Sequence, residues 1–140
     1  MTPQEQKYAA LAPIMSLAAI FAHPIASTLL PLILFFIFHA RRMEYARLVA
    51  LRAADLAFSM QLYLVFATLL LAGYLKFRPL PVNDVQYIVG AITLILIIYL
   101  SIALIVGIVQ AFRGKAVRYY LSLRIGERVF LARQNRQQKA

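Results

Sequence analysis

The sequence is poor in residues that carry chemistry. It contains no cysteine, which excludes disulfides, thiol nucleophiles and thiolate metal sites. Only five of its 140 residues are acidic, which leaves little material for acid–base catalysis. The nucleophile elbow, the zinc-protease helix, the phosphate loop and the dinucleotide-binding glycine pattern are also missing. We therefore expect a protein that is not an enzyme and that uses no cofactor and no metal.

Charge is missing from three long runs of the sequence. The segments Tyr8–Ala40, Leu56–Leu75 and Val85–Phe112 contain no Asp, Glu, Lys or Arg. A helix needs roughly 20 apolar residues to cross the hydrocarbon core of a bilayer. The hydrophobic share of 63% also lies above the roughly 45–50% of soluble domains. The sequence predicts an all-α integral membrane protein with one transmembrane helical domain over residues 1–130.

The first run carries its own interruptions. His23-Pro24 lies in its middle and Pro31 follows, and proline removes a backbone donor and disfavours helix at the residue before it. This pattern favours two short helices, 8–22 and 25–39, folded as a hairpin or a shallow re-entrant pair, over one kinked span. With helices at 55–75 and 85–112, four membrane helices are expected. The polar start of the chain does not resemble a signal peptide, so we expect the first run to be retained.

Basic residues gather between and after the runs. Residues 41–54 carry four arginines, and the tail from Arg113 carries eight Lys and Arg against one acid. Cytoplasmic loops of membrane proteins accumulate Lys and Arg in this way. We therefore predict a multi-pass membrane protein with both termini on the cytoplasmic side, or on the stromal side if the membrane is that of a plastid. The net charge of +10 is interpreted as a topology signal that favours anionic lipids, and not nucleic acid, as the electrostatic partner.

The two basic segments, 41–54 and 113–131, are expected to be amphipathic and to lie at the membrane interface, and residues 132–140 to be disordered. Gly114 fits a helix stop. Beyond it, apolar residues match both strand alternation and helical spacing, so periodicity does not decide the structure there. The candidate contacts to lipid head groups are Arg41, Arg42, Arg47, Arg52, Arg113, Lys115, Arg118, Tyr119 and Arg124.

A few polar residues lie inside or at the ends of the uncharged runs. We expect Asp55 to cap the helix that begins there, with Arg52 three residues earlier as its partner. His23 is interpreted as a turn residue at the interface, and His39 as a residue of the membrane edge. A transport role for a convergent polar set is the alternative. The candidates are His23, Asp55, Ser59, Gln61 and Gln110.

One stretch of the tail resembles a known family. The matching residues are Ala111, Arg113-Gly114, Arg118-Tyr119, Leu121, Leu123, Arg124 and Ile125. This pattern is similar to the C-terminal signature of a bacterial family of four-helix membrane proteins of unknown function, which is itself similar to the membrane component of the chloroplast Tic translocon. Upstream, Asp55-Leu56-Ala57-Phe58-Ser59 stands where that family has a motif near Ala-Leu-Asn-Phe-Gln, with Leu56 and Phe58 matching. The resemblance implies four helices with both termini inside and a location in the bacterial inner (cytoplasmic) membrane.

Three functions are compatible with these features. The leading hypothesis is a non-catalytic inner-membrane protein that packs with itself or with other membrane proteins, as a complex subunit or an assembly factor. The alternative is a component of a Tic-like protein-conducting or small-solute channel. The third is a sensor of anionic lipid surfaces that acts through the two basic segments.

Overall fold

The computed structural model describes residues 2–139, and every regular element within that range is a helix. Two of the helices are long and apolar enough to cross a membrane, and a third is apolar but shorter. The two long helices are α3 and α4, and the shorter apolar one is α2. The elements are α1 (Pro3–Ala22), α2 (Ala26–Ala40), α3 (Glu44–Phe77), α4 (Val82–Phe112) and α5 (Ile125–Lys139).

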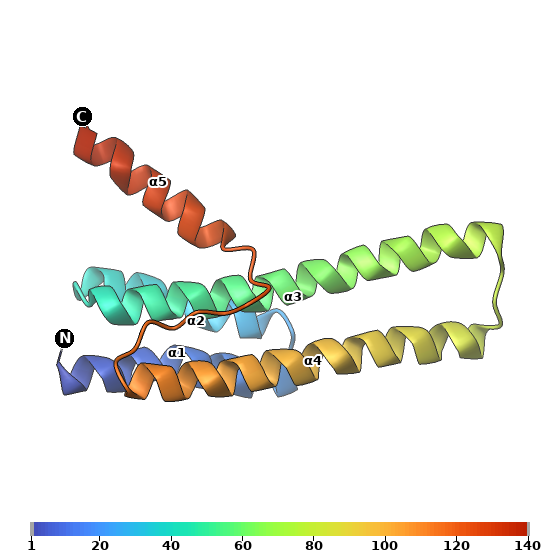
Figure 1. The fold of residues 1–140 in the computed structure, drawn as a ribbon, viewed down its shortest axis with the longest axis horizontal. Coiled ribbons are helices and arrows are strands. Elements are labelled where there is room, and N and C mark those ends of the chain that lie inside the picture. Colours follow the sequence, from blue (N-terminus) through green and yellow to red (C-terminus); the bar gives the residue numbers. More distant parts are fainter. Residues whose placement is uncertain (1, 140) are drawn as a thin grey trace.

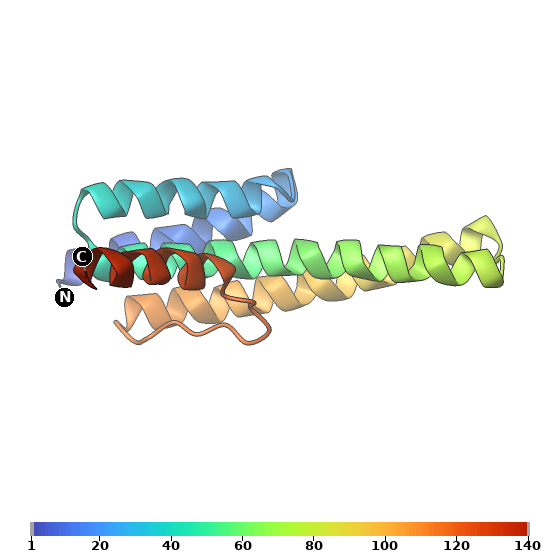
Figure 2. The same ribbon diagram turned by 90° about the horizontal axis from the view of Figure 1, so that it is seen from above.

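The helices form two antiparallel hairpins of unequal length. α3 and α4 make the long hairpin, and the shorter α1–α2 hairpin packs against only one half of it (Figures 1 and 2). We call this half, which also carries α5 and both ends of the described chain, the proximal half. The distal half is the remainder of α3 and α4 up to the turn at residues 78–81. The fold is therefore a packed helical bundle at one end and a bare pair of helices at the other.

The break predicted at His23-Pro24 is present, and it separates α1 from α2. Pro31, in contrast, lies inside α2 without ending it. Because proline has no N–H, the carbonyl of Ser27 four residues earlier lacks its helical partner. The Ser16 hydroxyl of α1 donates to that carbonyl at 2.7 Å, and both serines are buried. A hydrogen bond between the two helices thus replaces the one that Pro31 removes.

The turn between α1 and α2 stops midway along α3. The Gln61 side chain donates to the carbonyl of Pro24 in that turn. From Gln61 to the end of α3 at Phe77 the helix continues for about 24 Å at about 1.5 Å per residue. The short hairpin therefore does not reach the distal turn. Of the arrangements left open by the sequence, a hairpin of partial depth is the one observed.

The predicted boundary at residue 55 is wrong. The basic segment 41–54 and the span 55–75 form one continuous helix, which starts at Glu44. The turn before it is set by Arg42, which has a φ of 56°, and by Met43, whose N–H donates to the carbonyl of Phe38 at 3.0 Å. Nothing between Glu44 and Asp55 breaks a helix, since neither Gly nor Pro occurs there. The change in charge was mistaken for a change in structure.

The core of the proximal half is built from small side chains. Leu56 and Leu104 are the largest fully buried residues, and most of the remaining core positions of α1 and α3 are alanine. Small residues let helix backbones approach closely, which is the usual packing mode of helices in membranes. The buried small residues are Ala9, Ala10, Ala12, Ser16 and Ala19 in α1 and Ala46, Ala50, Ala53, Ala54 and Ala57 in α3.

The end of α4 follows the prediction made for Gly114. This residue has a φ of 65°, its N–H donates to the carbonyl of Ala111, and the N–H of Lys115 donates to that of Gln110. This is the Schellman pattern of a glycine helix stop. Residues 113–124, which we call the strap, then run without regular structure to α5. The basic segment 113–131 is thus a strap plus the start of a helix, and residues 132–139, expected to be disordered, are helical.

Candidate functional site: the polar cluster that anchors the C-terminal segment

One face of α3 carries the side chains that hold the strap and α5 in place. Tyr45, Arg52, Asp55, Ser59 and Tyr63 recur at helical spacing, and each makes a hydrogen bond with the C-terminal part of the chain. Side chains separated by three, four or seven residues share one face of a helix. Figure 1 shows the strap crossing between α4 and α3 before α5 leaves the bundle. The face is therefore a binding surface for the chain's own C-terminal segment.

Asp55 caps α5, not its own helix. Its carboxylate accepts the N–H groups of Gly126 at 2.8 Å and Glu127 at 3.0 Å, in the first turn of α5. These donors have no partner inside a helix, and a carboxylate at this position is also stabilised by the helix dipole. The predicted capping chemistry is present, but the prediction of which helix is capped was wrong. Asp55 lies in the interior of α3, where only the tertiary structure brings a helix N-terminus to it.

The sequence predicted Asp55 as the partner of Arg52, and this prediction is wrong. Arg52 pairs with the C-terminal part of the chain. Its guanidinium donates to the carbonyl of Val117 at 2.6 Å and to the Glu127 carboxylate at 3.2 Å. Arg124 lies 3.9 Å from the same carboxylate. Arg52 and Glu127 are both largely buried, so salt screens their attraction less than that of exposed ions. Glu127 was missed by the sequence reasoning, although it is the one acidic residue after Arg113.

Three tyrosines complete the attachment of the strap. The hydroxyl of Tyr45 donates to the carbonyl of Lys115, that of Tyr63 to Leu121 and that of Tyr99 to Tyr120, at 2.6 to 2.7 Å. Ser59 adds a contact of the opposite sense, since its hydroxyl oxygen accepts the N–H of Leu123 at 2.9 Å. A backbone without regular structure needs such partners wherever water is scarce. The tyrosines were not predicted, and no motif of the sequence marks them.

Tyr119 was predicted to contact lipid head groups, and this prediction is wrong. Its side chain is 6% exposed and lies against Gly107 of α4. A Cβ atom at Gly107 would overlap the tyrosine ring, so the glycine is required by the close approach of the strap. Burial raises the pKa of the Tyr119 phenol well above its usual range. The tyrosine of the Arg118-Tyr119 pair in the tail signature therefore packs against α4.

The structure places the predicted intramembrane polar residues in three parts of the fold. His23 lies exposed in the α1–α2 turn, where its ring accepts the N–H of Ile25, and Gln61 donates to the same turn. Asp55 and Ser59 belong to the cluster under the strap and α5. Gln110 is in the last turns of α4, separate from both groups. Within residues 2–139 no side-chain hydrogen bond joins these three places.

The predicted head-group contacts divide into exposed and enclosed residues. Arg47 and Arg52 are only partly exposed, since Arg47 lies 2.8 Å from the ring of His39 and Arg52 is held by the strap. The remaining arginines and the lysine of the set are exposed at the proximal half, and their role as lipid contacts stays a prediction. They are Arg41, Arg42, Arg113, Lys115, Arg118 and Arg124.

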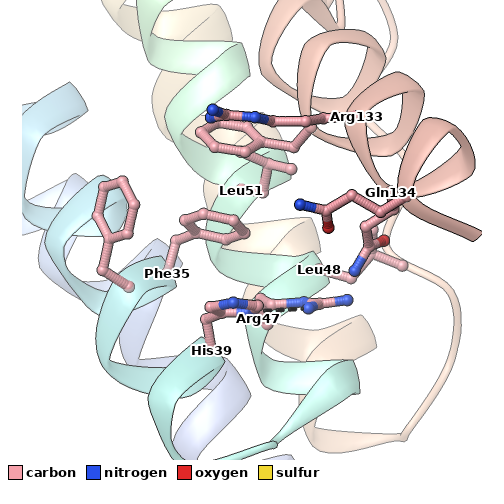
Figure 3. A pocket seen from close by; sticks show the side chains of 10 residues that line it. Phe35, His39, Arg47, Leu48, Leu51, Arg133 and Gln134 are labelled. Carbon is pink, nitrogen blue, oxygen red and sulfur yellow. Dashed lines mark hydrogen bonds between the residues drawn. The ribbon is translucent and has the colours of Figure 1, made fainter. Parts of the chain in front are cut away.

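A cleft of about 270 Å³ opens beside the cluster, between α2, α3 and α5. Phe35 and Phe130 meet across it with ring centroids 4.9 Å apart. Figure 3 shows Arg133 on one side of Phe35 and Arg47 on the other, with the amide of Gln134 directed between them. Over residues 2–139, no three His, Asp or Glu side chains gather in a way that could hold a metal ion. The cleft combines an apolar floor with cationic sides.

These features define an all-helical protein with two long apolar helices, most of whose surface is not buried, and a C-terminal segment anchored by a polar cluster. The chain belongs to the magnetosome magnetite crystal formation protein family (MamF/MmsF), whose family model matches residues 4–126. No curated protein and no solved structure matches the chain.

The family match corrects the resemblance drawn from the tail. The chain is not assigned to the Tic-like family, and a Tic-like channel finds no support. The residues that suggested it have local structural reasons: Gly114 ends a helix and Tyr119 fills the space above Gly107. A short signature that encodes a helix stop and a packed strap describes local geometry, and local geometry does not define a function.

Proposed function

We propose that this protein is a non-catalytic, multi-pass membrane protein that contributes to magnetite crystal formation by packing with itself or with other membrane proteins. The observation that carries the proposal is the low burial of its apolar helices. In their most apolar windows α3 is 22% buried and α4 is 17% buried. Core helices of soluble proteins bury most of such a surface. Contact with the hydrocarbon core of a bilayer accounts for the apolar surface of α3 and α4 that is not buried within the protein.

The distribution of charge supports an orientation for this proposal. All Lys and Arg residues except Lys76 and Arg78 belong to segments of the proximal half. By the positive-inside rule the proximal half faces the cytoplasm. α3 and α4 then cross the membrane, the α1–α2 hairpin enters part of the way and returns, and both termini are cytoplasmic.

The charge also favours a role in organising the membrane over direct binding of iron. A net charge of +10 repels cations. Glu5 accepts the N–H of Tyr45 at 3.0 Å, and Asp55 and Glu127 are engaged under α5. Three of the five carboxylates thus already contact other groups of the protein. The protein is better suited to shaping or recruiting the membrane around a crystal than to nucleating one.

Fractionation and gene deletion test the proposal separately. We expect the tagged protein to stay in the membrane pellet after a carbonate wash and to enrich with magnetically isolated magnetosomes. Deletion in the same cells should change the size or shape of magnetite crystals measured by electron microscopy. Release by carbonate would overturn the membrane assignment. Crystals identical to those of the parent strain would overturn the role in crystal formation.

A further inference from the structure

The cleft between α2, α3 and α5 has the composition of a site for an anionic amphiphile. Its floor is aromatic and aliphatic, and its sides carry two arginines and side-chain amides (Figure 3). Among the described residues, no carboxylate lines it. The residues used in the argument are Phe35, Phe36 and Leu51 on the floor and Arg47, Arg133 and Gln134 at the sides. A ligand that fits must offer negative charge on one part and an apolar surface on another.

The two arginines have charge available for such a ligand. Over residues 2–139 the ion pairs are Arg52–Glu127 and Arg124–Glu127, so neither Arg47 nor Arg133 is paired with a carboxylate. The 2.8 Å contact from Arg47 is to a ring nitrogen of His39, which leaves the charge of the guanidinium uncompensated. Arginine forks bind phosphate oxygens in a bidentate way. The charge of the cleft therefore complements a phosphate group.

The apolar part of the cleft continues onto the outside of the molecule. Phe36 belongs to the floor and is also 53% exposed, and Ile33 and Ile37 beside it on α2 are exposed as well. An acyl chain that lies along this face of α2 can reach the floor of the cleft without crossing polar surface. The proximal half is also where head groups of the cytoplasmic leaflet lie in the orientation proposed above.

We propose that this cleft binds one anionic phospholipid, whose phosphate lies between Arg47 and Arg133 and whose acyl chain follows Phe36 along α2. The proposal rests on the membrane location given under the proposed function. The site differs from a general attraction of basic segments to the bilayer, because it requires two particular arginines and an apolar floor. It also places a lipid between α5 and the bundle, so that the lipid joins the C-terminal helix to α2 and α3.

A pair of charge-matched variants tests the site. The full chain is purified in mild detergent, and binding of phosphatidylglycerol, phosphatidylcholine and glycerol 3-phosphate is measured by native mass spectrometry. Arg47→Gln with Arg133→Gln removes two charges from the cleft. Arg128→Gln with Arg136→Gln removes two charges from exposed positions that do not line it. Both variants carry the same net charge, so unspecific attraction is equal in the two.

We expect the cleft variant to weaken phosphatidylglycerol binding about tenfold more than the control variant does, because the general attraction lost with two charges, about fivefold or less per charge, is the same in both. The control variant should show only this general loss, and phosphatidylcholine should bind weakly to all three proteins. Equal weakening by both variants, or equal binding of both lipids, would overturn the site. Binding of glycerol 3-phosphate as tight as that of the lipid would show an anion site without the acyl chain and overturn the lipid assignment. A carbonate wash of each variant shows separately whether the membrane location holds.

Discussion

The proximal and distal halves of the α3–α4 hairpin both contain long apolar stretches, but these stretches have different surroundings. Leu104 of α4 is fully buried in the proximal half, whereas Leu94 on the same helix is 59% exposed in the distal half. The buried polar side chains of α3, Asp55 and Ser59, also lie in the proximal half, where α5 supplies hydrogen bonds to Asp55 and the strap supplies one to Ser59. The distal half has apolar residues exposed on both helices. Apolar composition thus shows which segments avoid water. Buried polar residues that have hydrogen-bond partners show where the chain packs against itself.

The largest expected effect on stability is that of Leu104→Ala, which is compared with Leu94→Ala on the same helix. Leu104→Ala removes a fully buried side chain and should lower the free energy of unfolding by about 3 kcal/mol, because it leaves a cavity. Leu94→Ala removes a side chain without close neighbours on its outer face and should cost less than about 1 kcal/mol. Reversible unfolding in mixed micelles, followed by circular dichroism, measures both. Equal losses would show that the two halves are packed alike.

The next comparison uses two aspartates. Asp55→Ala leaves the N–H groups of Gly126 and Glu127 without an acceptor and should cost about 2 kcal/mol. Asp84 lies exposed in the first turn of α4 at the distal turn, and Asp84→Ala should cost about 0.5 kcal/mol. Hydrogen exchange should become faster over residues 125–139 in the first variant alone. Protection of that segment unchanged in Asp55→Ala would contradict the capping role.

Two glycines give effects of opposite sign. Gly107→Ala forces the new Cβ into the ring of Tyr119 and should destabilise the protein by about 2 kcal/mol. Gly90→Ala meets nothing within 4 Å and should stabilise α4 by up to about 1 kcal/mol, since alanine favours helix. Thermal unfolding in the same detergent distinguishes the two. If Gly107→Ala is also stabilising, the strap does not lie on α4 as described.

The smallest effect concerns two tyrosines that face the strap. The Tyr119 hydroxyl has no hydrogen-bond partner within residues 2–139, so Tyr119→Phe should change stability by less than about 0.5 kcal/mol at pH 7. Tyr99→Phe loses the bond to the carbonyl of Tyr120 and should cost about 1 kcal/mol. Unfolding at pH 7 in mixed micelles compares the two variants. A larger loss for Tyr119→Phe than for Tyr99→Phe would show that the buried hydroxyl does have a partner.

The burial of Tyr119 also predicts that the stability of the protein depends on pH. Burial raises the pKa of Tyr119 in the folded protein, so the unfolded chain ionises first, near the usual value of about 10. The contribution to stability is complete below that pH and is lost as the pH rises further. Tyr119→Phe should therefore lose less stability than the parent between pH 8 and pH 11. An equal loss in both proteins would contradict the burial of the phenol.

Several features could be predicted from the sequence because they depend on local chemistry. The uncharged runs predicted helices, Pro24 predicted the break after Ala22, and Gly114 predicted the end of α4 through its left-handed φ. The start of α3 was misplaced because a cluster of arginines was interpreted as a boundary, although nothing there ends a helix. Local signals were reliable where they concerned backbone geometry, whereas the arginine cluster was misleading as a helix boundary.

The candidate site could be predicted only in part. Asp55 was recognised as a capping residue, but its partners lie 71 and 72 positions further along the chain. The bond from Arg52 to Val117 likewise joins positions 65 apart. Periodicity describes one element at a time, and such contacts appear only once the strap is placed on α3. The tyrosines that hold the strap were missed for the same reason.

The sequence by itself determined that the chain is helical and apolar, and that its positive charge gathers away from the distal turn, because these properties follow from residue type and short-range order. Only the tertiary structure decided that the α1–α2 hairpin stops midway along α3, that α5 is capped by a residue of another helix, and that the strap buries Tyr119. These features depend on hydrogen bonds and contacts between residues distant in the chain. No property of a single segment encodes them.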